Sequence, residues 1–186
     1  MKLKPIYILA GLSAVAIALA YKRNAAGSGE NKTTTAMPDS FAPSPGYPGT
    51  RGYRNNNPLN LRISGEPWRG KVSVDKNTDG VFEQFMSMPY GFRAAMINIR
   101  TQTNKGYRTL QQLINVWAPA GDGNNNPERY AATVSKRTGI AANQTIDTSS
   151  AAVMIPLASA MAYVENGSDP VPVDVKEGWN MYAKSV

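Results

Sequence analysis

Residues 54–62 read Arg-Asn-Asn-Asn-Pro-Leu-Asn-Leu-Arg, with four amide and two guanidinium side chains in nine positions. Amides both donate and accept hydrogen bonds, and the planar arginine fork binds carboxylates. Such a set suits a sugar that carries hydroxyl, N-acetyl and carboxylate groups. The other interpretation is an Asx-rich turn in which Pro58 prevents a helix. We take this stretch as the opening of the folded domain.

The composition restricts the chemistry that the chain can perform. Its 186 residues carry a formal net charge of +7, which favours an anionic partner, but no nucleic-acid-binding motif is present and nucleic acid is not expected. Because cysteine and histidine are absent, acid–base catalysis would fall to carboxylates, lysine, tyrosine or water. We expect no cofactor and no metal site, since Met86 stands where an EF-hand-like loop at residues 75–80 would need its bidentate glutamate.

The sequence divides into three parts. In residues 1–23, an uncharged apolar run over residues 5–21 predicts a transmembrane anchor or a cleaved signal peptide, and Lys22-Arg23 directly after it favours the anchor. Residues 24–50 are rich in Ala, Gly, Ser, Thr, Asn and Pro, and predict a flexible linker. Residues 51–186 predict the folded domain, which is only mildly basic, with 15 Lys and Arg against 11 Asp and Glu.

Within the domain, the pattern predicts an α+β fold with a small antiparallel sheet followed by about five helices. The expected strands are 59–63, 71–74 and 81–85, separated by glycine-containing turns. The expected helices are 90–105, 109–117, 127–139, 149–165 with a kink near Pro156, and a last short helix from Asp174.

Glu165 is the candidate catalytic acid. It lies at the end of an apolar helix that Asn166-Gly167 should stop. The negative end of the helix dipole and apolar neighbours would both raise its pKa, as a glycosidic general acid requires. The alternative is an ordinary exposed glutamate at a frayed helix end.

Other side chains are candidates for substrate binding. Trp68, in a glycine-containing loop, and Tyr163, two residues before Glu165, could stack on sugar rings, whereas Trp117 lies on an apolar helix face and is expected in the core. The asparagine-rich stretch would supply the remaining contacts, and these candidates are Arg54, Asn56, Asn57, Asn60 and Arg62.

The block from Arg51 to about Trp179 resembles small phage- and prophage-encoded cell-wall-degrading proteins of the lysozyme-like superfamily. The resemblance rests on the stretch 54–62 and on shorter pieces at 68–70, 81–85, 90–95, 117–119, 126–130 and 165–167. It is incomplete, because Leu59 replaces a usual glycine, and Tyr163 and Val164 stand where the family usually has an acid or a histidine. It implies a lysozyme-like fold, with Glu165 as the catalytic residue.

The order of the pieces suggests a circular permutation. In glucosaminidase-type relatives a glutamate-bearing helix end precedes the asparagine-rich segment, whereas here the asparagine-rich segment comes first. Such a permutation is tolerated when the termini lie close together. It predicts that Glu165 and Asn60 lie within the width of an active-site cleft, so a separation beyond roughly 20 Å would refute it.

These observations predict a membrane-anchored lytic transglycosylase or muramidase that acts on peptidoglycan, encoded by a phage and associated with the virion. The expected partners are peptidoglycan, a lipid membrane through residues 5–21, and other virion or envelope proteins. The expected location is the virion membrane or the bacterial inner membrane, with the domain facing the wall. The alternative function is a non-catalytic structural or adaptor protein of a virion or cell envelope.

Overall fold

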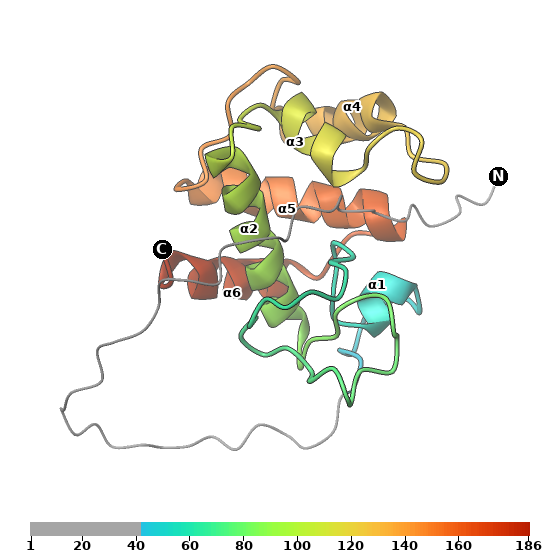
Figure 1. Ribbon diagram of the computed structural model, residues 1–186. Coiled ribbons are helices and arrows are strands. Elements are labelled where there is room, and N and C mark those ends of the chain that lie inside the picture. Colours follow the sequence, from blue (N-terminus) through green and yellow to red (C-terminus); the bar gives the residue numbers. More distant parts are fainter. Residues whose placement is uncertain (1–41) are drawn as a thin grey trace.

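The computed structural model describes residues 42–186, which contain six helices (Figure 1). The helices are α1 (Arg51–Arg54), α2 (Met88–Asn104), α3 (Leu110–Trp117), α4 (Pro127–Thr138), α5 (Ala151–Asn166) and α6 (Pro172–Ala183). The four predicted helices between residues 90 and 165 correspond to α2, α3, α4 and α5. The last predicted helix corresponds to α6, in which Asp174 lies in the first turn and Val171 is the N-cap.

Local signals in the sequence set several of the helix ends. Thr109 and Gln112 form a capping box that starts α3, because each side chain bonds the backbone N–H of the other residue. Asn126 caps α4 by accepting a hydrogen bond from the Arg129 N–H, and Gly139 ends this helix in the left-handed conformation. Gly167 ends α5 in the same way, so the position of Glu165 in the last turn is fixed by a glycine cap.

The hydrophobic core lies around α2, the central helix of Figure 1, which packs along α6 and contacts α5. Phe92, Met96 and Ile99 of α2 are fully buried. Helices α3 and α4 pack together, and α4 packs on α5. Gly178 of α6 permits the close approach to α2, because a Cβ there would lie 2.5 Å from the Cβ of Phe92. Trp117 is 4% exposed, which confirms its place in the core.

The prediction of an α+β fold with a small sheet is wrong, because residues 42–186 are mostly helical and form no β-strand or sheet. The expected strands 59–63, 71–74 and 81–85 lie side by side, but they share only isolated antiparallel bridges at Arg62–Phe82 and Lys71–Phe85. Side-chain amides take over part of the backbone bonding. Asn57 donates to the Glu83 carbonyl and its Oδ1 accepts from the Leu61 N–H, so these two backbone groups bond the amide side chain and not each other.

The predicted transmembrane helix and membrane location also need correction. Among residues 42–186, no helix combines the length and the apolar character needed to cross a bilayer. Residues 5–21, on which the prediction of a membrane anchor rested, lie outside the described residues.

Residues 42–50 precede α1 and contact the domain. The Ser44 N–H donates to Oδ1 of Asn56, and the Tyr47 hydroxyl donates to Asp174 on α6 at 2.7 Å. The rings of Tyr47 and Tyr53 lie 4.6 Å apart between centroids. Residues 42–50 are therefore part of the folded domain.

Candidate active site

Glu165 lies in the last turn of α5 with its carboxyl group turned into the protein. It is 3% exposed. The Tyr130 hydroxyl on α4 donates to Oε1 at 2.9 Å, and the Asn60 amide donates to Oε2 at 3.0 Å. No ion pair involves Glu165 among the residues that the structure describes. The carboxyl is thus held by two neutral donors from segments far apart in the sequence.

This environment raises the pKa of Glu165 to about 8. Burial is the largest cause, because it removes water from the charged form. The hydrogen bonds from Asn60 and Tyr130 act in the opposite direction. The indole N–H of Trp117 also lowers the pKa of Glu165, although this buried group makes no hydrogen bond within residues 42–186. At neutral pH the group is therefore mostly a carboxylic acid with a proton to donate.

The expected closeness of Glu165 and the asparagine-rich stretch is confirmed. Asn60, with a left-handed φ of 51°, directs its amide at the carboxyl group, while its Oδ1 is buried and has no hydrogen bond within residues 42–186. Asn166 fastens the end of α5 to the same stretch, because its amide donates to the Pro58 carbonyl and its Oδ1 accepts from Thr50. The circular permutation itself stays a prediction.

The lack of a side chain at Gly52 leaves space for the amide groups of Asn60 and Asn166. A Cβ at this position would lie 2.5 Å from Oδ1 of Asn166 and 2.8 Å from Oδ1 of Asn60. Both distances are shorter than any tolerable contact, so a side chain at Gly52 would displace one of the two amides. The absence of a side chain here therefore allows α1 to approach the end of α5.

Asn56 and Asn57 hold the loop together and are fully buried. The Asn56 amide donates to the carbonyls of Ala42 and Phe85, and its Oδ1 accepts from the Ser44 N–H. The Asn57 amide is likewise occupied by two backbone carbonyls, and its Oδ1 accepts from the Leu61 N–H. Both amides are engaged by the backbone, so Asn60 is the residue of the three that reaches the acid.

The other predicted binding residues have contacts of their own. Arg54 is exposed, with a 3.3 Å hydrogen bond to the Gly49 carbonyl, and Arg62 lies over the Phe82 ring. Trp68 is half-buried against the core. Tyr163 is half-buried on α5, where the Arg137 guanidinium lies 3.8 Å from its ring centroid.

Four acids between residues 59 and 85 are candidates for a second carboxylate: Glu66 and Asp75 are exposed, and Asp79 and Glu83 are paired with bases. Asp79 accepts two hydrogen bonds from Arg51 and further hydrogen bonds from Asn55 and the Phe82 N–H. These bonds hold the pKa of Asp79 well below its usual range, although burial alone would raise it. Glu83 is fully buried and accepts hydrogen bonds from Lys71 and Ser64. Glu165 differs from both in having only neutral donors.

Tyr130 is the residue of the site that the sequence analysis did not assign. It lies in α4 beside the buried Ala131 and Val134, so its position indicated a core residue. A buried tyrosine needs a hydrogen-bond partner for its hydroxyl, and this need was the one sign in the sequence that Tyr130 would contact a polar group. Its partner lies 35 positions along the chain, so only the packing of α4 on α5 reveals it.

A comparison with known proteins finds a phage relative. Protein P5 of Pseudoalteromonas phage PM2 is 37% identical over 139 residues, which cover 71% of this chain and 82% of that protein. The chain belongs to the Protein P5 family. This relationship supports a bacteriophage origin. No protein-family model matches the chain, so the resemblance to the lysozyme-like superfamily stays a prediction.

Proposed function

We propose that this member of the Protein P5 family cleaves the glycan strands of peptidoglycan, with Glu165 as the general acid. The observation that carries the proposal is the buried carboxyl group whose pKa is raised to about 8 and whose two oxygens face Asn60 and Tyr130. Glycosidases need an acid of raised pKa to protonate the leaving oxygen of the glycosidic bond. Neutral donors suit this role because they orient the acid without forcing it to ionise.

The two partners have different parts in the proposed reaction. Asn60 only donates to the carboxyl group, whereas a tyrosine hydroxyl both donates and accepts, so Tyr130 can receive a hydrogen bond from the protonated acid. The bonds at 3.0 and 2.9 Å use one lone-pair direction of each carboxyl oxygen, so the acid proton can lie along another direction while both partners stay in place. We regard Asn60 and Tyr130 as positioning residues.

A transglycosylase reaction needs only this one acid. Protonated Glu165 gives its proton to the glycosidic oxygen as the bond from that oxygen to the anomeric carbon breaks. The resulting carboxylate takes the proton of the muramic 6-hydroxyl, whose oxygen closes on the same carbon to form a 1,6-anhydro ring. The acid is regenerated and no water is consumed. The pairing of Asp79 with Arg51 and of Glu83 with Lys71 removes these two acids as the free second carboxylate that a hydrolysis would need.

The proposal is tested by the clearing of purified sacculi. Wild-type protein should reduce the turbidity of the suspension, and Glu165→Gln, which keeps the shape but cannot donate a proton, should abolish the effect. Glu177→Gln, an exposed acid on α6, is the matched control and should clear sacculi like the wild type. Clearing by the Glu165→Gln protein at the wild-type rate would refute the role of this residue.

A second candidate function is non-catalytic binding to a virion or envelope partner. The observation that favours it is the 3% exposure of Glu165, whose carboxyl group is already satisfied by protein donors. Under this alternative the buried acid would be a structural link between α4, α5 and the asparagine-rich stretch. A folded wild-type protein that binds sacculi without clearing them would favour it.

A further inference from the structure

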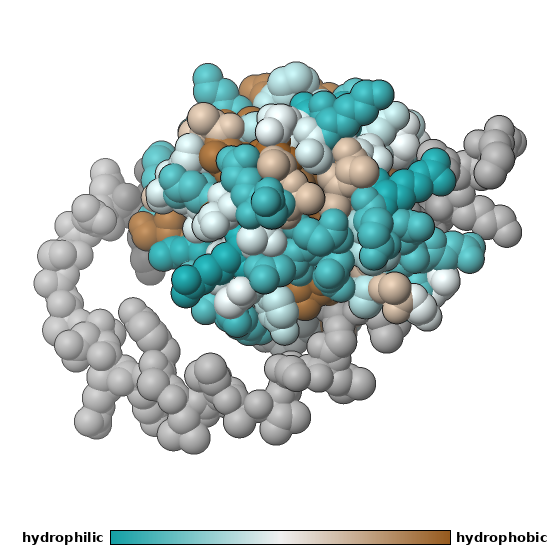
Figure 2. All heavy atoms as spheres, turned by 90° about the horizontal axis from the view of Figure 1, so that it is seen from above, coloured by the Kyte–Doolittle hydropathy of each residue, from teal (hydrophilic) through white to brown (hydrophobic). Residues whose placement is uncertain are grey.

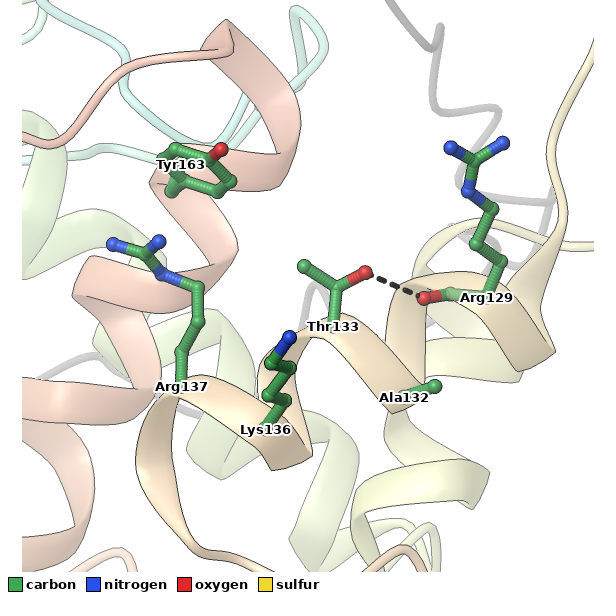
Figure 3. A pocket seen from close by; sticks show the side chains of 6 residues that line it. All are labelled: Arg129, Ala132, Thr133, Lys136, Arg137 and Tyr163. Carbon is green, nitrogen blue, oxygen red and sulfur yellow. Dashed lines mark hydrogen bonds between the residues drawn. The ribbon is translucent and has the colours of Figure 1, made fainter.

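A basic groove lies along the outer side of α4, next to α5 (Figure 3). Its volume is about 490 Å³, and its lining residues are Arg129, Ala132, Thr133, Lys136, Arg137 and Tyr163. In Figure 3, Arg129 and Arg137 lie at opposite ends of the α4 segment, with Thr133 and Lys136 between them. The face of the molecule that Figure 2 shows is largely hydrophilic, with separate apolar spots.

The positive charges of Arg129 and Lys136 in the groove are not neutralised by acidic side chains of residues 42–186. Arg129 and Lys136 are exposed and form no ion pair with any residue from 42 to 186. Arg137 lies over the Tyr163 ring and pairs with Asp169 outside the groove. No acidic residue of the described range 42–186 lines the groove. Arg129 and Lys136 lie seven positions apart, about 10 Å along the helix axis, so an extended anionic ligand could meet both side chains.

We infer that this groove binds the carboxylates of the peptide stems carried by the glycan strand. The inference rests on the proposed function and names a part of the substrate that the Glu165 site does not explain. A guanidinium fork suits a carboxylate, and the half-buried Tyr163 and the methyl group of Ala132 offer apolar contact to the stem itself.

The groove and the acid lie on different sides of the same helix pair. Tyr130 turns inward to Glu165, while the neighbouring Arg129 lines the groove. Tyr163 precedes Glu165 by two positions, or about 3 Å along the helix axis. Half the circumference of a helix of about 10 Å diameter is about 16 Å, whereas a stem of four residues reaches about 13 Å when extended. The stem in the groove is therefore expected to come from another sugar of the same strand than the one at Glu165.

Binding to two defined ligands tests the inference without requiring catalysis. The full chain carrying Glu165→Gln is titrated with soluble glycan strands that keep their peptide stems, and with strands from which an amidase has removed the stems. The same titrations are repeated after adding Arg129→Gln and Lys136→Gln, which remove the two unpaired charges. Lys176→Gln with Lys184→Gln, two exposed lysines of which one lies in α6 and the other is its C-cap, is the control for a general loss of positive charge.

We expect the groove variant to bind stem-bearing strands about tenfold more weakly, while its affinity for stem-free strands is unchanged. The control variant should keep at least most of the affinity for stem-bearing strands. Equal losses with both ligands, or no loss with either, would overturn the inference. Whether the wild type clears sacculi is a separate readout, so failure of the proposed activity is distinguishable from failure of stem recognition.

Discussion

Replacing Glu165 by glutamine should change how the stability of the protein depends on pH. The native carboxyl group has a pKa raised to about 8 by burial, from a value of 4.5 for the free side chain. In the unfolded chain the same group ionises above about pH 4.5. Between these two values the native state holds a proton that the unfolded state has released, so stability falls as the pH rises. Glutamine does not titrate and removes this dependence.

The size of the effect follows from the difference between the two pKa values, in which a difference of 1.0 corresponds to about 1.4 kcal/mol. The stability that Glu165 contributes is fully present below pH 4.5 and is lost progressively up to about pH 8. Across the range from pH 5 to pH 8, wild type should lose about 4 kcal/mol of unfolding free energy relative to Glu165→Gln. This is a large part of the stability of an ordinary domain.

Urea unfolding followed by tryptophan fluorescence at pH 5, 6, 7 and 8 measures this difference directly. The comparison between the two proteins cancels the titration of every other group. Glu177→Gln serves as the control, because an exposed acid should give a difference that is nearly independent of pH. A difference between wild type and Glu165→Gln that stays constant within about 0.5 kcal/mol over the range would show that the carboxyl group is not held protonated.

Three other substitutions test the surroundings of the acid and the fold. Gly52→Ala should destabilise the protein by about 1–3 kcal/mol, because its Cβ would lie 2.5 Å from Oδ1 of Asn166, and a normal melting temperature would contradict this. Tyr130→Phe removes a hydrogen bond that lowers the pKa of Glu165, so the alkaline limb of the activity profile should move to higher pH, and a move to lower pH would refute the assignment. Thr109→Ala should cost about 1 kcal/mol in urea unfolding by breaking the capping box of α3, whereas an unchanged midpoint would show that the box contributes nothing.

The helical part of the fold could be predicted from the sequence because its signals are local. The apolar face that ends at Trp117, the Asn126-Pro127 start of α4 and the glycines after α4 and α5 each act within a few residues. Such signals do not depend on the rest of the chain. The predicted ends therefore agree with the observed helices to within a few residues.

The sheet could not be predicted correctly because the decisive interactions are distant and lie in side chains. The segments around Leu61 and Phe82 have the composition of strands and lie side by side. The amides of Asn56 and Asn57 bond backbone carbonyls that a ladder would otherwise use. A run of asparagines in the sequence does not reveal whether its amides face a ligand or the backbone of its own protein.

The site was accessible to sequence reasoning only in part. The position of Glu165 beside a helix-stopping glycine and the order of the motifs were sufficient to predict its contact with Asn60, while its catalytic role stays a prediction. The direction of the pKa shift was also expected, although burial is its main cause in the structure. Tyr130 and the basic groove on α4 depend on how α4 packs against α5, which no local pattern specifies.

Mass spectrometry of peptidoglycan digested by the wild-type chain tests the proposed chemistry most directly. If the Glu165 acid cleaves the glycan by the one-acid route, the fragments should end in 1,6-anhydromuramic acid, and Glu165→Gln should yield none of them. Fragments with reducing ends would contradict the transglycosylase reaction, and intact strands from a folded, sacculus-binding protein would contradict catalysis altogether.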